Sequence, residues 1–207
     1  MKAIVAGAGA FGRKHLDGIA KIDGVDVVGV VDSVPELAKK VADQYGVEHA
    51  LTSLDDALAL RDVDAAILAT PTQMHAAQAI QCMDAGKHVE VEIPVADSLA
   101  DAKAVLEKQK ESGLVCQVGH TRRFNPSHQW VHDRISAGEL TVHQMAVQPY
   151  FFRRPNLNAE GEPRSWTDHL LWHHAAHTVD LFQYQTGEKV VARSAMQGPK
   201  HPELGIA

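Results

Sequence analysis

Three glycines near the amino terminus have a spacing that suits phosphate binding. The stretch GAGAFG places Gly7, Gly9 and Gly12 after an apolar run and at the start of an amphipathic one. The first glycine permits a tight turn, the second lets the backbone approach a pyrophosphate, and the third allows a helix to pack closely on a strand. A helix that begins at Ala10 and Phe11 presents free N–H groups to anions. The loop predicts dinucleotide binding, and the alternative is a turn that serves packing alone.

An acidic residue follows at the distance that dinucleotide-binding domains use. Asp32 lies 20 residues after Gly12, at the end of the second apolar run. A carboxylate there accepts hydrogen bonds from the adenine ribose and repels a 2′-phosphate, which favours NAD. Ser33 can bind a phosphate and Arg13 opens the adjacent helix, so NADP stays open as the cofactor. The alternative role for Asp32 is that of a capping or turn residue.

Histidines are frequent, with 13 in 207 residues, and three recur every four residues. His169, His173 and His177 would share one face of a helix. They can line a substrate pocket with His177 or His173 as the base, bind a metal, or simply pack. We expect the pocket and no metal, because one helix face rarely supplies three zinc ligands. His174 points to a different side.

Cationic side chains near these histidines suit an acidic substrate. Arg122 and Arg123 follow the last buried strand, and Arg164 precedes the histidine-rich helix. Their guanidinium groups can hold carboxylates in a bidentate fork, although each of them could instead lie on the surface. Of Arg153 and Arg154, one is expected on a solvated face. His120, at the junction of two predicted domains, is expected to reach the nicotinamide region and to bind the substrate.

The first 120 residues have the pattern of a scaffold that could position these groups. Short apolar runs alternate with amphipathic stretches. The apolar runs are 2–8, 25–32, 64–70, 88–93 and 114–119, and the amphipathic stretches are 11–22, 34–46, 73–86 and 98–113. Helix ends are marked by Pro35 near a first turn, Gly46 after a last turn and Ser98 at an N-cap. This alternation predicts an α/β Rossmann domain, 1–120, with a doubly wound parallel sheet.

The pattern changes after Gly119. We predict a helix at 125–139, an antiparallel strand at 141–152, a polar loop at 153–166, a helix at 167–187 and a strand at 189–197. These elements indicate an α+β domain, 121–207, with a mostly antiparallel open sheet. Two strands and two helices make a thin core. We therefore expect either an incomplete form of a larger domain, or a domain that is stabilised by contacts with the first domain and with a partner.

Composition excludes several classes of protein. The net charge is −6 and the pI is about 6.1, which argues against a nucleic-acid partner. No run approaches the roughly 18 apolar residues of a membrane span, and the amino terminus lacks the layout of a signal peptide. Cys82 and Cys116 have no metal-type spacing and are expected to be reduced thiols of a cytoplasmic protein.

Four motifs in order, ATPTQMHAAQA, GKHVEVEIPVA, GHTRRFNP and HHAAHTVDLF, resemble those of the Gfo/Idh/MocA oxidoreductases. The resemblance implies a dinucleotide domain joined to a domain with a large open sheet, which often forms a homodimer interface. It also implies that the chain is a shortened member of the family. The further cofactor-binding residues that it implies are Thr70, Pro71, His75, Glu92 and Ile93.

Two positions depart from the family's pattern. Most members have Glu-Lys-Pro where this chain has Glu92, Ile93 and Pro94, and the family's lysine is implicated in proton transfer. Ile93 cannot carry a proton. The second motif usually has an Asp and a His where this chain has His173 and His177. Because the surrounding motifs are intact, the two departures indicate a subgroup with its own chemistry.

Within the family, the stretches EIPVADS, GHTRRFNPSHQ, YFFRR and GEPRSWTDHLLWHHAAHTVDLF resemble those of a branch that acts in protocatechuate 4,5-cleavage. This resemblance implies oxidation of the cyclic hemiacetal of a small dicarboxylate semialdehyde to 2-pyrone-4,6-dicarboxylate, with NADP as the usual acceptor. A neutral His suits the removal of the hydroxyl proton. The alternatives are a sugar or inositol dehydrogenase, which the missing lysine disfavours, and a dinucleotide-binding protein without turnover.

Overall fold

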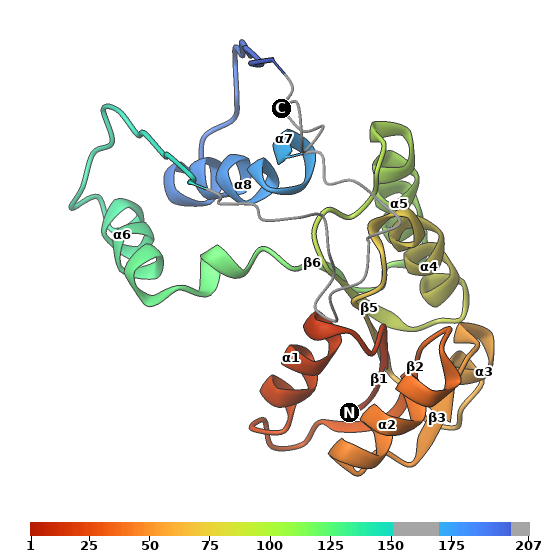
Figure 1. Cartoon of the computed structure of the whole chain (residues 1–207). Coiled ribbons are helices and arrows are strands. Elements are labelled where there is room, and N and C mark those ends of the chain that lie inside the picture. The colour runs from red at the N-terminus through yellow and green to blue at the C-terminus, as the bar shows by residue number, and fades with distance from the viewer. Residues whose placement is uncertain (151–169, 200–207) are drawn as a thin grey trace. The chain divides into compact units, whose positions relative to one another are not determined.

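A six-stranded parallel sheet forms the centre of the first unit of the chain. A computed structural model describes residues 1–150 and 170–199, which divide into two units, Met1–Gly119 and His120–Ala207. The strand order is β3-β2-β1-β4-β5-β6, and every neighbouring pair is parallel (Figure 1). The strands are β1 (Lys2–Ala6), β2 (Asp26–Val31), β3 (His49–Leu51), β4 (Ala65–Leu68), β5 (His88–Val91) and β6 (Cys116–Val118). This order confirms the predicted Rossmann fold.

Five helices cover the two faces of this sheet. They are α1 (Ala10–Ile19), α2 (Pro35–Tyr45), α3 (Leu54–Leu58), α4 (Thr72–Asp84) and α5 (Leu99–Ser112). One core packs the sheet against α1 and α2, and the other packs it against α3, α4 and α5. Because the chain order turns from β1 to β4 in the middle of the sheet, a ligand crevice is expected above the carboxyl ends of these two strands.

Side chains alternate between the two cores along each strand. Ile4 and Leu68 lie in the core beneath α3, α4 and α5, whereas Val5 and Ile67 face α1 and α2. Each fully buried Val, Leu or Ile contributes roughly 1.5–3 kcal/mol by leaving water. These continuous apolar strands are buried on both faces, which is why the sheet could be predicted from its runs of Val, Ile and Ala.

Predicted helix ends agree with the structure. Ser98 caps α5 by accepting a hydrogen bond from the Asp101 N–H at 3.1 Å, and Pro35 occupies the first turn of α2. Gly46 ends α2 with a left-handed φ of 67°. The short strand β3 and the short helix α3 were not predicted, because five residues or fewer give too little periodicity to recognise.

The regular secondary structure in the described part of the second unit is helical. The helices are the 3₁₀ turn η1 (Thr121–Phe124), α6 (Pro126–Ser136), α7 (Leu170–His173) and α8 (Ala175–Thr186). The predicted helix at 167–187 is therefore interrupted at His174, which separates α7 from α8. No helix among the described residues is long and apolar enough to cross a membrane.

The predicted antiparallel strands of this unit are wrong for the residues that the structure describes. Neither 141–150 nor 189–197 forms a strand. Alternating side chains favour an extended backbone, but a strand also needs a neighbour that accepts and donates its backbone hydrogen bonds. Neither segment has such a neighbour in the described ranges, and residues 151 and 152 of the first strand lie outside them.

Candidate functional site

The glycine loop has the steric properties of a pyrophosphate cradle. Gly7 follows β1 with a left-handed φ of 96°, and its N–H donates to the Val31 carbonyl at 2.8 Å. A Cβ on Gly7 would overlap the Ala69 carbonyl, and a Cβ on Gly12 would overlap the Gly7 carbonyl. A Cβ on Gly9 would meet nothing within 4 Å. The first and third glycines therefore pack the turn, and the second leaves open space for a ligand.

The amino end of α1 can accept an anion in that space. Gly9 is the N-cap of the helix, and no side chain caps its first turn. Ala10 and Phe11 are exposed there, and the Lys14 Nζ lies 4.9 Å from the centre of the Phe11 ring. Uncapped N–H groups at a helix N-terminus favour negative charge. The loop and the helix thus fit a dinucleotide pyrophosphate.

Asp32 joins the glycine loop to the turn after β2. Its Oδ2 accepts a hydrogen bond from the Ala8 N–H at 2.9 Å, and its Oδ1 accepts one from the Val34 N–H at 3.0 Å. The carboxylate thus lies at the carboxyl end of β2, and Ser33 beside it is exposed. Both roles weighed for Asp32 are compatible with this geometry, since a carboxylate has lone pairs beyond the two that are used.

His75 connects the turns that follow β4 and β5. The ring is 1% exposed, with Nε2 at 2.8 Å from the Thr70 carbonyl oxygen and Nδ1 at 2.8 Å from the Pro94 carbonyl oxygen. The Thr70 hydroxyl donates to Gln78 at 2.5 Å, and Pro71 is exposed at the N-cap of α4. His75 therefore holds the two turns together.

A cluster of three ionisable side chains lies at the end of β5. Its members, named here the β5 cluster, are His15 from α1 with Glu90 and Glu92 from β5 and its end. The His15 Nε2 is 2.8 Å from the Glu92 Oε1 and 3.9 Å from the Glu90 Oε2. The second Glu92 oxygen accepts a hydrogen bond from the Ile93 N–H at 3.3 Å, and the Ile93–Pro94 peptide is cis. Ile93 itself is half-buried.

The groups of the β5 cluster shift each other's protonation. Burial raises the pKa of Glu90 to about 7, although the charge of His15 acts against burial. Burial also works to raise the pKa of Glu92, but the hydrogen bond and charge of His15 outweigh it and lower that pKa. The hydrogen bond to Glu92 raises the pKa of His15 despite burial. Near neutral pH the cluster therefore holds a proton that is readily lost.

The sequence interpretation missed His15 and Glu90. Glu92 was assigned from the family motif alone, without its partners. Two signals were present: His15 lies three residues after Gly12, and Glu90 and Glu92 alternate with buried valines along an otherwise apolar strand. Carboxylates in a buried strand require a partner, and the first helix supplies one.

In the second unit an ion pair joins η1 to α8. Arg123 donates from Nε to the Asp180 Oδ2 at 2.8 Å and from a terminal nitrogen to the Asp180 Oδ1 at 2.5 Å. The Arg123 guanidinium also lies 5.5 Å from the centre of the Tyr184 ring. Arg123, predicted to bind substrate, is thus already engaged. Asp180 was missed, although it lies one helical turn after His177.

His120 lies beside this pair. Its Nδ1 is 3.7 Å from the Asp180 Oδ2, and its ring meets the His177 ring edge-on, with 6.1 Å between the centres. Burial lowers the pKa of His120, although Asp180 acts to raise it. A neutral imidazole near a second imidazole and a carboxylate can accept a proton. The structure therefore brings His120, His177 and Asp180 together.

The remaining predicted site residues have different outcomes. The Arg122 Nε is buried and has no hydrogen-bond partner among the described residues, so it has a donor to offer. His173 is buried at the end of α7, on a different helix from His177. His169, Arg153, Arg154 and Arg164 lie outside the described residues. Within 1–150 and 170–199, no group of three or more His, Cys, Asp or Glu is placed to hold a metal ion.

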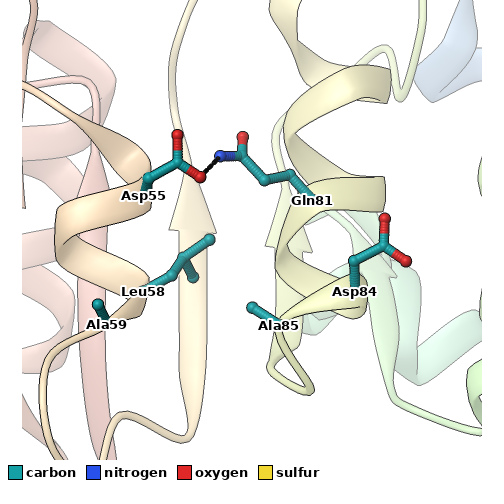
Figure 2. A pocket seen from close by; sticks show the side chains of 6 residues that line it. All are labelled: Asp55, Leu58, Ala59, Gln81, Asp84 and Ala85. Atoms are coloured by element: carbon teal, nitrogen blue, oxygen red, sulfur yellow. Dashed lines mark hydrogen bonds between the residues drawn. The ribbon is translucent and has the colours of Figure 1, made fainter.

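A surface hollow of about 350 Å³ lies elsewhere in the first unit, between α3 and α4 (Figure 2). Asp55 and Gln81 face each other across it, and the Gln81 amide donates to the Asp55 carboxylate at 2.6 Å. Asp84 and Ala85 lie at the end of α4, just before β5 begins. The hollow is therefore near the amino ends of the strands, away from the edge where ligands of this fold bind.

Comparisons with known proteins agree with this geometry. Residues 1–120 match the family described as "Oxidoreductase family, NAD-binding Rossmann fold" (GFO_IDH_MocA), and residues 126–207 match "Bacterial oxidoreductases, C-terminal". The chain is 67% identical over 207 residues to "4-carboxy-2-hydroxymuconate-6-semialdehyde dehydrogenase" of Sphingobium sp., and it spans 65% of that protein's length. It is 29% identical over 198 residues to "scyllo-inositol 2-dehydrogenase (NAD(+))" of Bacillus subtilis, covering 94% of this chain and 56% of that protein.

Two solved dehydrogenase structures are also similar to this chain. The WlbA dehydrogenase from Bordetella pertussis in complex with NADH and UDP-GlcNAcA matches 89% of this chain and 55% of that one, at 28% identity and a TM-score of 0.76. Scyllo-inositol dehydrogenase from Lactobacillus casei with bound NAD(H) and scyllo-inositol matches 67% and 42%, at 26% identity and a TM-score of 0.64. With its glycine cradle, strand order and matching family pattern, this chain belongs to the Gfo/Idh/MocA oxidoreductase family and carries its NAD-binding Rossmann domain.

Proposed function

We propose that this protein oxidises the cyclic hemiacetal of 4-carboxy-2-hydroxymuconate-6-semialdehyde to 2-pyrone-4,6-dicarboxylate, with NAD or NADP as the hydride acceptor. The observation that carries the proposal is the 67% identity, over all 207 residues, to a dehydrogenase named for this semialdehyde. The reaction removes a hydride from the carbinol carbon and a proton from its hydroxyl group. It therefore needs a bound nicotinamide and a base.

The first unit supplies the dinucleotide site in this proposal. The pyrophosphate rests on the glycine loop and on the free N–H groups of α1, and the adenosine half lies toward the end of β2. The residues assigned to the cofactor are Gly7, Gly9, Ala10, Phe11, Gly12, Asp32, Ser33, Thr70, Pro71, His75, Glu92 and Ile93. When bound, the oxidised nicotinamide accepts the hydride.

Asp32 bears on the choice between the two cofactors. Its carboxylate is fixed at the end of β2 by the N–H groups of Ala8 and Val34. A fixed negative charge there repels a 2′-phosphate and favours NAD. The exposed Ser33 can donate to a phosphate, and the family branch that the chain resembles usually takes NADP. Both acceptors therefore belong in the assay.

The base is assigned to the histidines of the second unit. Ile93 replaces the family's lysine and cannot accept a proton, whereas His177 and His173 occupy the second motif. The His177 ring meets that of His120, a second titratable group. A neutral imidazole accepts a proton efficiently near pH 7.

Cationic and imidazole groups are assigned to the two substrate carboxylates. Arg122 has a buried nitrogen with no described partner, and His120, His173 and Arg164 are the further candidates. Arg123 is assigned a positioning role for Asp180, with which it forms two hydrogen bonds. The homodimer that the family resemblance implies would be formed by the second unit.

Substrate and cofactor can be tested in one assay. The semialdehyde, generated enzymatically, is incubated with the 207-residue chain and NAD or NADP, and the absorbance of the reduced nicotinamide is followed. We expect reduction with the semialdehyde and none with scyllo-inositol or myo-inositol. Turnover of an inositol alone would favour a polyol dehydrogenase. Cofactor binding in calorimetry without any turnover would favour a dinucleotide-binding protein that does not catalyse the reaction.

A further inference from the structure

The β5 cluster is a group of charges on a face of the sheet that is otherwise apolar. Val89 and Val91 lie in the core beneath α3, α4 and α5, so Glu90 and Glu92 point to the opposite face. On that face the neighbouring strand β4 presents Ile67, and His15 reaches across from the second turn of α1. Two carboxylates in such surroundings cost free energy unless they are paired and hydrogen-bonded.

The contacts of the cluster are unequal. Glu92 has a hydrogen bond to His15 at 2.8 Å and one from the Ile93 N–H at 3.3 Å. The buried Glu90 Oε2 has only the longer approach of His15 at 3.9 Å and no hydrogen-bond partner among the described residues. A Cβ on Gly119 would lie 3.0 Å from the Glu90 Oε1, so the backbone of Gly119 closes one side. Glu90 is the member that can change its charge without losing a hydrogen bond.

The place of the cluster in the sheet puts it under the nicotinamide half of the proposed dinucleotide site. Dinucleotides lie across the point where the strand order reverses, here between β1 and β4. Because Asp32 at the end of β2 marks the adenosine side, the nicotinamide half falls toward β4 and β5. Glu92 follows the last residue of β5, at the carboxyl edge of the sheet.

We propose that the β5 cluster discriminates between the oxidised and the reduced cofactor through the charge of Glu90, an inference that rests on the proposed function. The oxidised nicotinamide ring carries a positive charge and the reduced ring carries none. With Glu90 protonated, the charges of His15 and Glu92 cancel. Once Glu90 loses its proton the cluster has a net charge of −1, which attracts the oxidised ring and leaves the reduced ring unaffected.

The protonation of Glu90 and Glu92 depends on the charged groups around them. The charges of His15 from α1 and of Glu92 act on Glu90, and those of His15 and of His75 from α4 act on Glu92. His75 is buried between two carbonyl oxygens. The pKa of Glu90 is about 7, so the net charge of the cluster changes within the working range of an enzyme. A more alkaline medium should therefore strengthen binding of the oxidised cofactor and leave the affinity for the reduced one unchanged.

The test is a comparison of two dissociation constants. The affinity of the whole chain for the oxidised and for the reduced cofactor is measured by isothermal titration calorimetry from about pH 6 to about pH 8. For the wild type, we expect the ratio of Kd for the reduced to Kd for the oxidised form to rise roughly three- to tenfold with pH. For Glu90→Gln, which keeps the shape and stays neutral, we expect the ratio to rise less with pH than in the wild type.

Two further variants complete the design. Glu107→Gln removes a carboxylate that is exposed on α5 and should keep the wild-type pH dependence. Glu90→Met is a second neutral variant of similar length, and it replaces Glu90→Gln if the glutamine variant folds poorly. The same result is expected for both variants. The inference would be overturned by a ratio of dissociation constants that stays constant in the wild type. It would also be overturned by a ratio that rises in both neutral variants as much as in the wild type. Failure of the wild type to bind either cofactor form would instead overturn the proposed function together with it.

Discussion

Gly12 and Gly9 of the cofactor loop have different roles, close packing at Gly12 and open space for a ligand at Gly9. Substitution by alanine can distinguish these two roles. Gly12→Ala places a methyl group against the Gly7 carbonyl, so we expect a loss of stability of about 2 kcal/mol or more together with a loss of cofactor binding. Gly9→Ala meets open space. We expect it to leave the free energy of unfolding within about 1 kcal/mol but to weaken cofactor binding at least about tenfold.

Urea unfolding and calorimetric titration of both variants provide the measurement. Gly18→Ala is the matched control, because Gly18 also lies in α1, a methyl group added there would meet nothing within 4 Å, and alanine should stabilise the helix. A Gly9→Ala variant that binds the cofactor as tightly as the wild type would mean that this loop is not the cofactor cradle.

Glu90 makes the stability of the first unit depend on pH. Its pKa is raised from 4.5 to about 7 in the folded protein, so between these values the folded state keeps a proton that the unfolded chain has lost. The free energy of unfolding should then fall by about 2 kcal/mol as pH rises through this window, after a reduction for partial solvent screening. His15 acts in the same direction, since its raised pKa gives stability that is lost at higher pH.

Urea unfolding of the wild type and of Glu90→Gln at about pH 5 and about pH 8 measures this effect. The glutamine cannot lose a proton, so the variant should be more stable than the wild type at the higher pH and similar to it at the lower pH. Equal pH dependence in the two proteins would mean that Glu90 is ionised in both states.

Single residues also mark the limit of prediction from sequence. The glycine loop and Asp32 were recognised because their positions follow from the covalent order of strand, turn and helix. His15 and Glu92 are separated by 77 residues, and their contact follows only from the packing of α1 on the sheet. Asp180 could have been found, because it lies one helical turn after His177.

At the scale of elements, the Arg123–Asp180 pair holds η1 against α8. Asp180 is buried, so Arg123→Ala would leave a carboxylate without its two charged hydrogen bonds. We expect a loss of stability of about 2 kcal/mol, with the partial exposure of Arg123 taken into account. The control is Arg134→Ala, whose ion pair with Glu139 lies on the surface and should contribute less than about 1 kcal/mol.

Thermal unfolding followed by circular dichroism compares the two variants. A positioning role for Arg123 predicts that the stability loss comes with little change in the affinity for substrate. If Arg123→Ala were as stable as the wild type and instead raised KM about tenfold or more, Arg123 would be a substrate ligand.

Elements differed in how well the sequence predicted them. The strands of the first unit are continuous apolar runs whose burial on both faces is visible in the sequence. The two strands predicted at 141–152 and 189–197 rested on alternation alone, and alternation does not supply a hydrogen-bonded neighbour. The helix predicted at 167–187 is interrupted at His174, which periodicity could not reveal because the apolar pattern continues across the break.

At the scale of the whole molecule, the chain joins a dinucleotide domain to a histidine-bearing unit. It spans 65% of the length of its Sphingobium relative. The proposed reaction divides between the two units, with hydride acceptance in the first and proton acceptance in the second. This division predicts that the two functions can be lost separately.

His177→Ala tests that division. Removing the proposed base should lower kcat by roughly 100-fold or more, while the dissociation constant of the cofactor, which binds the first unit, stays unchanged. The matched control is His143→Ala, an exposed histidine of the same unit outside the assigned site. An unchanged kcat in His177→Ala would exclude this residue as the base, and His173 would then be tested in the same way.

The proposed function requires that a hemiacetal is oxidised while a nicotinamide is reduced in equal amount. One reaction mixture of the protein, the semialdehyde and the oxidised cofactor, followed by absorbance and by mass spectrometry together, measures both halves of this reaction. We expect a product lighter than the hemiacetal by two hydrogens, formed in equal amount with the reduced cofactor, and formed more slowly at limiting cofactor when Gly9→Ala replaces the wild type. Reduced cofactor without this product, or consumption of the semialdehyde without reduced cofactor, would contradict the proposed function.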